Sequence, residues 1–362
     1  MNSKLGSKIC LDVFGESHGA AIGAVLTGLP SGIDIPFEDM ALQGARRAPG
    51  RDKTATPRKE ADVPEFLSGV LDGKTTGAPL TLIIKNSDTH SNNYDNLAAC
   101  PRPSHSDYPA FIKYGGFNDI RGGGHFSGRL TAPIVAAGTI CRAILKKQGI
   151  IVGGHIAQIG SVTDTSFDPV NVSAAQLDRL SHSTFALNCG DREEAMRGEI
   201  EGARLEGDSV GGIVELAVTG LPAGIGNPMF SGVENVIATA LYGVPAVKAV
   251  AFGDGFDFGG LRGSEANDEM YYENNTVKTK TNHCGGICGG ITNGMPLIIK
   301  VALKPTPSIS KPQRTVNLKT GENTELIIEG RHDPCIVPRA LPALEAILCI
   351  ALLDLLAQEG KI

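Results

Sequence analysis

Two histidines on glycine- or proline-containing loops are the side chains of this sequence best suited to proton transfer. His18 lies in the run Gly-Glu-Ser-His-Gly at residues 15–19, and His105 follows Arg102 and Pro103 by a few positions. Histidine has an ordinary pKa close to neutral pH, so it can donate and accept protons under working conditions. A single histidine on a loop is more often structural than catalytic, so neither residue identifies a reaction by itself.

Cationic side chains gather on similar loops. The run 46–59 holds six of them within fourteen residues, and Arg121 with the three glycines that follow it precedes an expected helix, whose N-terminus attracts anions. Arginines in a turn can bind phosphate or carboxylate groups through paired hydrogen bonds, although a run of charges is also common on solvated surfaces. Together with the histidine loops, these segments favour a binding site for a polyanionic molecule.

The usual nucleotide and zinc motifs are incomplete. Residues 73–75 (Gly-Lys-Thr) resemble the end of a phosphate-binding loop, but the glycine required five residues earlier is Ser68. The triple glycine at 122–124 lacks the third glycine of the dinucleotide pattern, because that position is Ser127. Two cysteines and a histidine at 283–288 have no second pair of ligands, so we expect reduced thiols and no metal site.

One segment of the chain is repeated. Residues 15–33 align without a gap on residues 207–225, with nine of nineteen positions identical. His18 of the first copy corresponds to Val210 of the second. We therefore expect one domain over residues 1–362, made of two pseudo-repeats at about 8–165 and 207–358 joined by a charged segment at 168–206, with the chemistry in the first half.

Apolar patterns predict the elements that hold these loops. Two helices, beginning near Thr131 and within 331–358, are apolar on nearly all sides and should lie centrally. Smaller helices are expected at 176–180 and 191–205, and glycine and proline should keep the run 46–59 from forming a regular helix. The expected strands are 79–85, 150–160, 210–219, 245–252 and 296–303. This pattern predicts an α/β (α+β) fold, a β-α-β sandwich with helices between sheets.

Composition narrows the class of protein. The 362 residues are 41% hydrophobic and 20% charged, which is typical of a folded chain, and a net charge of −6 argues against a general nucleic-acid binder. The N-terminal segment does not resemble a signal peptide, and the apolar stretch 346–353 is shorter than the ~20 residues that a bilayer requires. We expect a soluble cytoplasmic protein with no nucleic-acid or membrane partner.

Six ordered motifs together resemble the chorismate synthase family, from about residue 8 to the C-terminal helix. They are Gly-Glu-Ser-His-Gly at 15–19, Arg46-Arg47 with Pro49-Gly50, Arg102-Pro103-x-His105-x-Asp107-Tyr108, Arg121-Gly122-Gly123-Gly124, Lys304-Pro305-Thr306-Pro307-Ser308 and Gly330-Arg331-His332-Asp333-Pro334.

The resemblance implies a reaction, a cofactor and an assembly. The reaction is the anti-1,4-elimination of phosphate from 5-enolpyruvylshikimate 3-phosphate to give chorismate. It requires reduced FMN (FMNH2) although no net oxidation occurs, and we expect an external reductant, with NADPH as the electron source. The family also implies a homotetramer.

The resemblance also implies roles for individual residues. His18 would protonate the departing phosphate, His105 would protonate the reduced flavin, and Asp333 with Ser17 and Ser127 would form a proton relay. The implied flavin contacts are His125, Phe126, Ser127, Ala246, Gly289, Lys304, Pro305, Thr306, Pro307, Ser308 and Arg331. The implied substrate contacts are Arg46, Arg47, Lys53, Arg129 and Arg339.

The chain departs from the family pattern after the triple glycine, where His125 and Phe126 replace the usual arginine and serine. If His125 faces the flavin, the affinity for FMN should fall as pH rises through the pKa of that histidine; if it points away, no such dependence is expected. Two other functions remain open: a flavin-dependent oxidoreductase acting on a small polyanionic substrate, and a non-enzymatic anion- or RNA-binding protein that uses the run 46–59.

Overall fold

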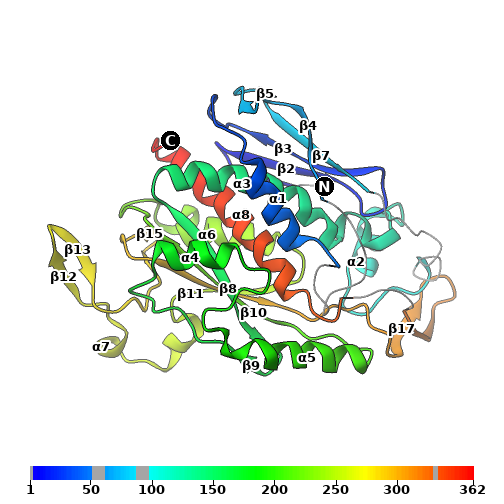
Figure 1. Cartoon of the computed structure of the whole chain (residues 1–362). Helices are drawn as coiled ribbons and strands as arrows, with labels where there is room; N and C mark the ends of the chain where they lie inside the picture. The colour runs from blue at the N-terminus through cyan, green and yellow to red at the C-terminus, as the bar shows by residue number, and fades with distance from the viewer. Residues whose placement is uncertain (1–2, 51–61, 87–97, 329–332) are drawn as a thin grey trace.

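Two five-stranded antiparallel sheets enclose a layer of helices in the computed structural model, which describes residues 3–50, 62–86, 98–328 and 333–362 (Figure 1). The first sheet has the order β1 (Lys4–Leu5), β2 (Cys10–Gly15), β3 (Ala21–Thr27), β7 (Leu80–Lys85) and β4 (Glu65–Ser68). Leu80, Leu82 and Ile84 alternate with more exposed residues along β7, so one face of this sheet covers the helices.

The second sheet has the order β11 (Val247–Phe252), β16 (Leu297–Leu303), β10 (Gly212–Thr219), β8 (Ile151–Ile159) and β9 (Val162–Thr163). Its four longer strands and β7 of the first sheet lie within the five segments expected from the sequence, so those predictions are confirmed. The sandwich is also the predicted fold class.

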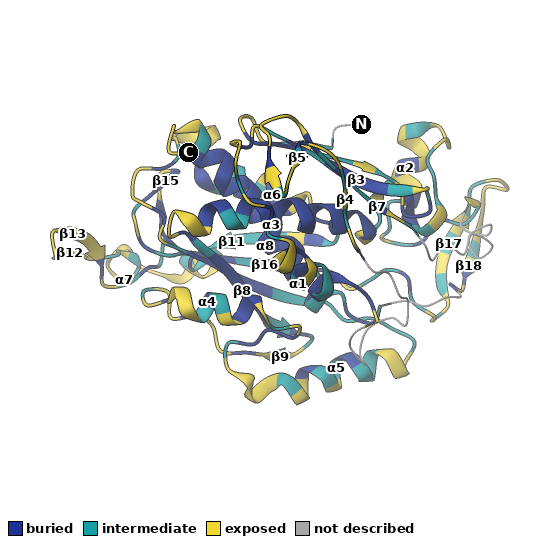
Figure 2. Cartoon of the chain, turned by 45° about the horizontal axis from the view of Figure 1, so that its top comes forward, coloured by how far each residue is buried: buried dark blue, intermediate teal, exposed yellow. Residues whose placement is uncertain are grey.

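The central layer consists of α1 (Phe37–Arg47), α3 (Thr131–Lys147), α6 (Val233–Tyr242) and α8 (Val337–Gln358). Figure 2 shows α3 and α8 as largely buried, as their apolar sequences predicted. The two helices approach closely at Gly138, where an added Cβ would lie 2.5 Å from Cβ of Ala346. Packing of α1 against both helices brings the first cationic residues into this layer.

Two segments, Gly128–Lys147 and Val337–Gln358, are long and apolar enough to cross a membrane by length and composition. The sequence analysis counted only residues 346–353 of the second, and this was wrong because Glu345 and Asp354 continue the same helix as buried residues. Within the structure, 83% and 89% of their most apolar windows are buried between the sheets. Core helices of soluble proteins have the same character.

Smaller elements surround the sandwich. The predicted outer helices appear as α4 (Ala174–Ser181) and α5 (Glu193–Leu205); α2 (Asp107–Tyr114) and α7 (Gly263–Ala266) complete the α-helices of the described residues. Short 3-10 turns are η3 (Arg121–Phe126), η4 (Gly128–Leu130), η5 (Gly190–Arg192), η6 (Met229–Ser231) and η7 (Gly255–Gly260). The two-stranded hairpins are β5 (Val70–Leu71) with β6 (Lys74–Thr75), β12 (Met270–Glu273) with β13 (Thr276–Thr279), β14 (Ile287–Cys288) with β15 (Ile291–Thr292), and β17 (Gln313–Asn317) with β18 (Glu322–Leu326).

The repeated segment has the same local structure in both copies. It contains β3 in one sheet and β10 in the other, and each strand is followed by a glycine with positive φ, 86° at Gly28 and 84° at Gly220. After each turn a threonine hydroxyl accepts a backbone N–H at 2.9 Å, from Ile33 to Thr75 and from Ile225 to Thr292. The limits of the two pseudo-repeats stay a prediction.

The expectation that the run 46–59 would not form a regular helix was wrong for its first two residues. Arg46 and Arg47 form the last turn of α1, and the chain leaves the helix only at Ala48. Acidic residues in the first turn and these two arginines in the last complement the helix dipole, which favours the helix although a proline and a glycine follow it. The rest of the cationic run, residues 51–61, lies outside the described residues.

Candidate active site

The triple glycine brings the two candidate histidines to one place. All three glycines have positive φ, between 54° and 86°. An added Cβ at Gly122 would overlap the His18 imidazole, and one at Gly123 would lie 3.5 Å from Cε1 and Nε2 of His105. Glycine is therefore favoured by the backbone conformation at all three positions, and at Gly122 it is also required for the space that the His18 ring occupies.

Two serines lie at the same loop. Ser17 is fully buried, its backbone N–H donates to the Gly124 carbonyl at 3.1 Å, and its Oγ has no hydrogen-bond partner among the described residues. Cβ of Ser127 lies 3.7 Å from the position of a Cβ on Gly123, and its Oγ accepts the backbone N–H of Arg129 at 3.3 Å. Four of the five predicted catalytic residues, His18, His105, Ser17 and Ser127, are thus adjacent to the glycine loop.

Three of the predicted substrate arginines form a second group. Asp62 accepts Nε of Arg47 at 2.6 Å and is also ion-paired with Arg129, and all three side chains are buried. Arg339 is ion-paired with Asp333, the fifth predicted catalytic residue, and donates from Nε to the Arg47 carbonyl at 3.0 Å. Burial lowers the pKa of Arg47 to about 10, so it stays cationic at neutral pH. The group carries three positive and two negative charges.

Asn86, at the end of β7, connects the arginines to the histidine loop. Its Oδ1 accepts Nε of Arg129 at 3.1 Å, while its Nδ2 donates to the carbonyls of Glu16 at 3.1 Å and Gly19 at 2.8 Å. The sequence analysis missed both Asn86 and Asp62. Neither is part of a recognisable motif, and only their position directly after a strand or beside the cationic run could have drawn attention to them.

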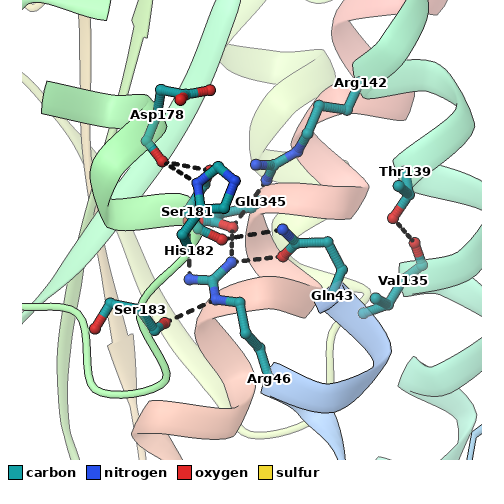
Figure 3. Close-up of polar contacts among 10 residues, drawn as sticks. All are labelled: Gln43, Arg46, Val135, Thr139, Arg142, Asp178, Ser181, His182, Ser183 and Glu345. Carbon is teal, nitrogen blue, oxygen red and sulfur yellow. Dashed lines mark hydrogen bonds and ion pairs between the residues drawn. The ribbon is translucent and has the colours of Figure 1, made fainter. Parts of the chain in front are cut away.

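Arg46 lies in a different network, shown in Figure 3. It donates to Glu345 at 2.7 Å, to Gln43 at 2.6 Å and to the Ser183 carbonyl at 2.9 Å, and Arg142 also donates to Glu345 at 2.8 Å. Burial alone would raise the pKa of Glu345, but the two guanidinium groups outweigh it and hold that pKa below its ordinary value. The structure does not bring Arg46 to the other predicted substrate residues; Arg46 joins α1 to α8.

The segment after β16 packs against the His105 loop. Nζ of Lys304 donates to the Ser104 carbonyl, and Nη1 of Arg102 donates to Oγ of Ser308 at 3.1 Å. Five of the eleven predicted flavin contacts, Lys304, Pro305, Thr306, Pro307 and Ser308, thus belong to a segment that reaches the His105 loop from the second half of the chain.

Other predicted flavin contacts differ in their surroundings. Ala246 has a positive φ of 74° and its carbonyl accepts the Lys304 N–H at 3.0 Å, so it adjoins this segment. Oγ1 of Thr306 is buried without a partner among the described residues. Gly289 lies in the turn between β14 and β15, and none of the hydrogen bonds of the described chain joins it to the histidines. Phe126 is partly exposed, and the centroid of its ring lies 6.5 Å from that of Tyr114.

His125 contacts the protein backbone through its ring. Nδ1 lies 2.8 Å from the Gly15 carbonyl, and Nε2 lies 2.8 Å from Oγ of Ser3. Because a carbonyl only accepts, Nδ1 carries a proton and holds the start of the Gly15–Gly19 loop. Two further predicted contacts, Lys53 and Arg331, lie outside the described residues. No cluster of three metal-ligating side chains occurs in the described part of the chain.

Comparison with known proteins gives the family. The model of the chorismate synthase family matches residues 9–357. A chorismate synthase of Thermococcus gammatolerans is 46% identical over 351 residues, 96% of each chain, and one of Dehalococcoides mccartyi is 44% identical over 364 residues, 100% of this chain and 98% of the other. A crystal structure of a chorismate synthase, 27% identical, matches 98% of this chain and 93% of its own with a TM-score of 0.77. With matches over nearly its whole length, this chain belongs to the chorismate synthase family.

Proposed function

We propose that this protein is a chorismate synthase that eliminates phosphate from 5-enolpyruvylshikimate 3-phosphate by anti-1,4-elimination, using residues of the site described above. The family makes it a carbon-oxygen lyase of aromatic biosynthesis. The observation that carries the assignment of residues is the glycine loop, which adjoins both His18 and His105. Asn86 in turn connects the loop that holds His18 to the arginine group.

Substrate binding is assigned to Arg47, Arg129 and Arg339, with Lys53 as a further predicted contact. The substrate carries two carboxylates and a phosphate, and guanidinium groups bind such anions through paired hydrogen bonds. Asp62 and Asp333 hold the guanidinium groups in fixed orientations but cancel only part of their charge. The remaining positive charge supports binding of an anion in an otherwise acidic protein.

His18 is assigned the proton that neutralises the leaving phosphate. A general acid must reach the leaving oxygen and have a pKa near the working pH, and histidine meets the second condition. Ser17, next to it, is buried with an unused hydroxyl, so a bound ligand could supply the missing hydrogen bond. Asp333 and Ser127 stay predicted members of the relay that carries the second proton away.

The residues present fit a flavin. Two buried hydroxyls, of Ser17 and Thr306, have no partner among the described residues, and the glycine loop brings backbone without side chains close to His105. Lys304, Ser127 and the neighbouring segment 304–308 would hold the cofactor. When bound, reduced FMN supplies electron density that eases the elimination without net oxidation. His105, at the same glycine loop, would accept and return a proton at the cofactor.

An anaerobic assay tests this function. Purified protein is mixed with 5-enolpyruvylshikimate 3-phosphate and dithionite-reduced FMN, and phosphate and chorismate are measured. We expect many turnovers per flavin and none with oxidised FMN, because the elimination is redox-neutral. Flavin oxidised in a one-to-one ratio with product would instead identify an oxidoreductase. Binding of RNA that weakens steeply with salt, with no turnover, would identify the anion-binding alternative.

We also propose a homotetramer. Large apolar side chains are exposed on η6, η7 and the β12–β13 hairpin, with Phe230 89%, Phe256 88% and Tyr272 80% exposed. Figure 2 shows the β12–β13 hairpin as exposed. Exposed apolar groups of this kind support self-association. Light scattering on a gel-filtration column should give four subunits for the wild type and fewer for Phe230→Asp with Tyr272→Asp; a wild-type monomer would contradict the proposal. We further propose a cytoplasmic location and an external, NADPH-linked supply of reduced FMN.

A further inference from the structure

We propose that Asp107, held by Arg102, is a positioning residue that keeps a proton on Nδ1 of His105 and turns Nε2 of that ring toward the glycine loop. The inference deepens the proposed function, because it rests on the assignment of His105 to proton transfer.

The contact between the two side chains fixes the position of the proton. Nδ1 of His105 lies 2.6 Å from Oδ1 of Asp107. An ionised carboxylate only accepts hydrogen bonds, so Nδ1 must donate. Nη2 of Arg102 lies 3.1 Å from the same nitrogen, but a guanidinium has no acceptor and cannot receive that proton. The neutral ring therefore has its lone pair on Nε2.

Asp107 is itself held rigidly. Arg102 donates from Nε to Oδ2 at 2.7 Å, from Nη2 to Oδ1 at 2.8 Å and from its backbone N–H to Oδ2 at 3.0 Å. Both side chains are buried, and Arg102 is fixed in turn by Ser308. Burial would raise the pKa of Asp107, but the hydrogen bonds from Arg102 and His105 outweigh it and hold that pKa well below its ordinary range. Asp107 is ionised at every working pH.

Nε2 faces the candidate active site. The position of a Cβ on Gly123 is 3.5 Å from this nitrogen, and Nε2 makes no hydrogen bond with the described residues. Burial lowers the pKa of His105, Arg102 and Lys304 lower it further, and the hydrogen bond to Asp107 opposes them. At neutral pH Nε2 is thus largely a proton acceptor, and Asp107 stabilises the imidazolium once a proton arrives.

Nitrogen NMR of the ligand-free protein tests the tautomer directly. In protein labelled with ¹⁵N-histidine, a ring nitrogen that bears hydrogen and one that bears a lone pair have clearly different shifts, and His105 is assigned from its absence in His105→Gln. We expect the Nδ1–H form in the wild type and its loss, or a mixture of forms, in Asp107→Asn. Asp107→Glu keeps a carboxylate and should retain the Nδ1–H form. An unchanged tautomer in folded Asp107→Asn would overturn the proposal.

Kinetics test whether Asp107 acts through His105. Asp107→Asn should lower kcat by about 10²-fold or more with little change in KM, and the limb of the pH profile that belongs to His105 should move to lower pH. In the His105→Ala background the same change should cost almost nothing further. Equal losses in both backgrounds would overturn the proposal, because they would indicate a purely structural role.

A matched control is Asp178→Asn. Asp178 lies on α4, and its carboxylate is paired with Lys146 of α3 at 2.9 Å. This variant should leave kcat and its pH profile unchanged. If the wild type fails to convert 5-enolpyruvylshikimate 3-phosphate, the proposed function fails. The tautomer measured by NMR then still decides the role of Asp107.

Discussion

His18 of the candidate active site depends on a neighbour that has no side chain. At Gly122 even a methyl group would overlap the His18 ring, and at Gly124 it would meet the Asp119 carbonyl. The sequence motif Gly-Gly-Gly is therefore a steric requirement here, and the same loop accepts the Ser17 N–H. Replacement of Gly122 by alanine would therefore move the His18 ring from its position, and any loss of proton transfer would follow from that displacement.

The repeated segment supplies a control for the role of His18. His18→Ala and His105→Ala should each lower turnover by roughly 10²-fold or more, the scale of a general acid or base, while the fold survives because both residues lie on loops. Val210 occupies the corresponding place in the second half and packs against the core, with its N–H donated to the Pro334 carbonyl at 2.8 Å. Val210→Ala should keep its activity.

Turnover is measured by phosphate release and folding by thermal unfolding of each variant. A loss in Val210→Ala as large as that in His18→Ala, without loss of stability, would contradict the proposed asymmetry of the two halves.

The contacts of the His125 ring favour the second expectation, in which His125 does not act on flavin binding through its charge. Its two nitrogens contact the Gly15 carbonyl and the Ser3 hydroxyl, so both are engaged by the protein, and the ring holds the start of the Gly15–Gly19 loop. We expect His125→Gln, which can still donate to the carbonyl but cannot titrate, to show the same change in FMN affinity between about pH 6 and 8 as the wild type. Fluorescence titrations at several pH values measure this. Curves that diverge as pH rises would indicate that His125 contributes charge to the flavin.

Among the strands, β8 and β10 share a buried ionic cluster that has no part in the proposed reaction. His155 on β8 is fully buried, with Nδ1 3.0 Å from Asp164 and Nε2 2.9 Å from Glu215 on β10. Burial would lower the pKa of His155, but the two carboxylates outweigh it and raise that pKa above its ordinary value. Glu215 also accepts the Phe167 N–H at 2.8 Å, so the cluster fastens the loop after β9 to the sheet.

This cluster predicts how stability depends on pH. A raised pKa in the folded protein means that His155 contributes stability that is fully present below about pH 6.5 and is lost as pH rises through the folded pKa. Burial would raise the pKa of Asp164, but the hydrogen bonds that it accepts outweigh burial and lower that pKa. The stability that Asp164 contributes is therefore lost under acid conditions, as the pH falls through its folded pKa. His155→Ala should lower the free energy of unfolding by about 3 kcal/mol near neutral pH.

Urea unfolding at several pH values measures both effects. The decline of stability above about pH 6.5 should be smaller in His155→Ala than in the wild type. A decline of the same size in both proteins would assign it to other groups.

Regular elements were predictable where the apolar pattern was strong. The runs 79–85 and 296–303 and the two central helices formed as expected, because their burial decides their conformation. The last turn of α1 was missed, since a charged run bounded by proline and glycine carries no apolar period. Asp62 and Asn86 were missed for a different reason. Their partners are distant in sequence, and such pairings arise only from the tertiary fold.

For the molecule as a whole, we propose that the chain arose by duplication and that its two halves then took different roles in the active site. The two copies of the repeated segment keep the same turn, and each contributes a strand to a different sheet. Only the first copy keeps a histidine at the proposed active site. The second half of the chain still contributes to the proposed active site, because the segment 304–308, which follows β16, contacts the His105 loop. The active site thus requires both halves, although the proposed acid and base come from one.

The two ends of the chain are joined by a single carboxylate. Asp354 on α8 is buried and accepts the backbone N–H groups of Ser7 at 3.1 Å, Lys8 at 2.7 Å and Ile9 at 2.8 Å, which precede β2 and the loop that holds His18. Gln358, one turn further along the helix, donates to the other oxygen at 2.9 Å. The chain's first turn is thereby attached to its last helix.

Asp354→Asn removes the charge and one acceptor oxygen while preserving the shape of the side chain. Hydrogen bonds to a buried charged group contribute about 1.5–3 kcal/mol, so we expect the free energy of unfolding to fall by about that amount in urea titrations. The exposed Glu359→Gln, on the same helix end, is the control and should change little. Because β2 leads directly to His18, hydrogen exchange of the amides of residues 7–15 should also accelerate in Asp354→Asn. A loss of stability without faster exchange there would place the effect in α8 alone and not in the attachment of the N-terminal turn.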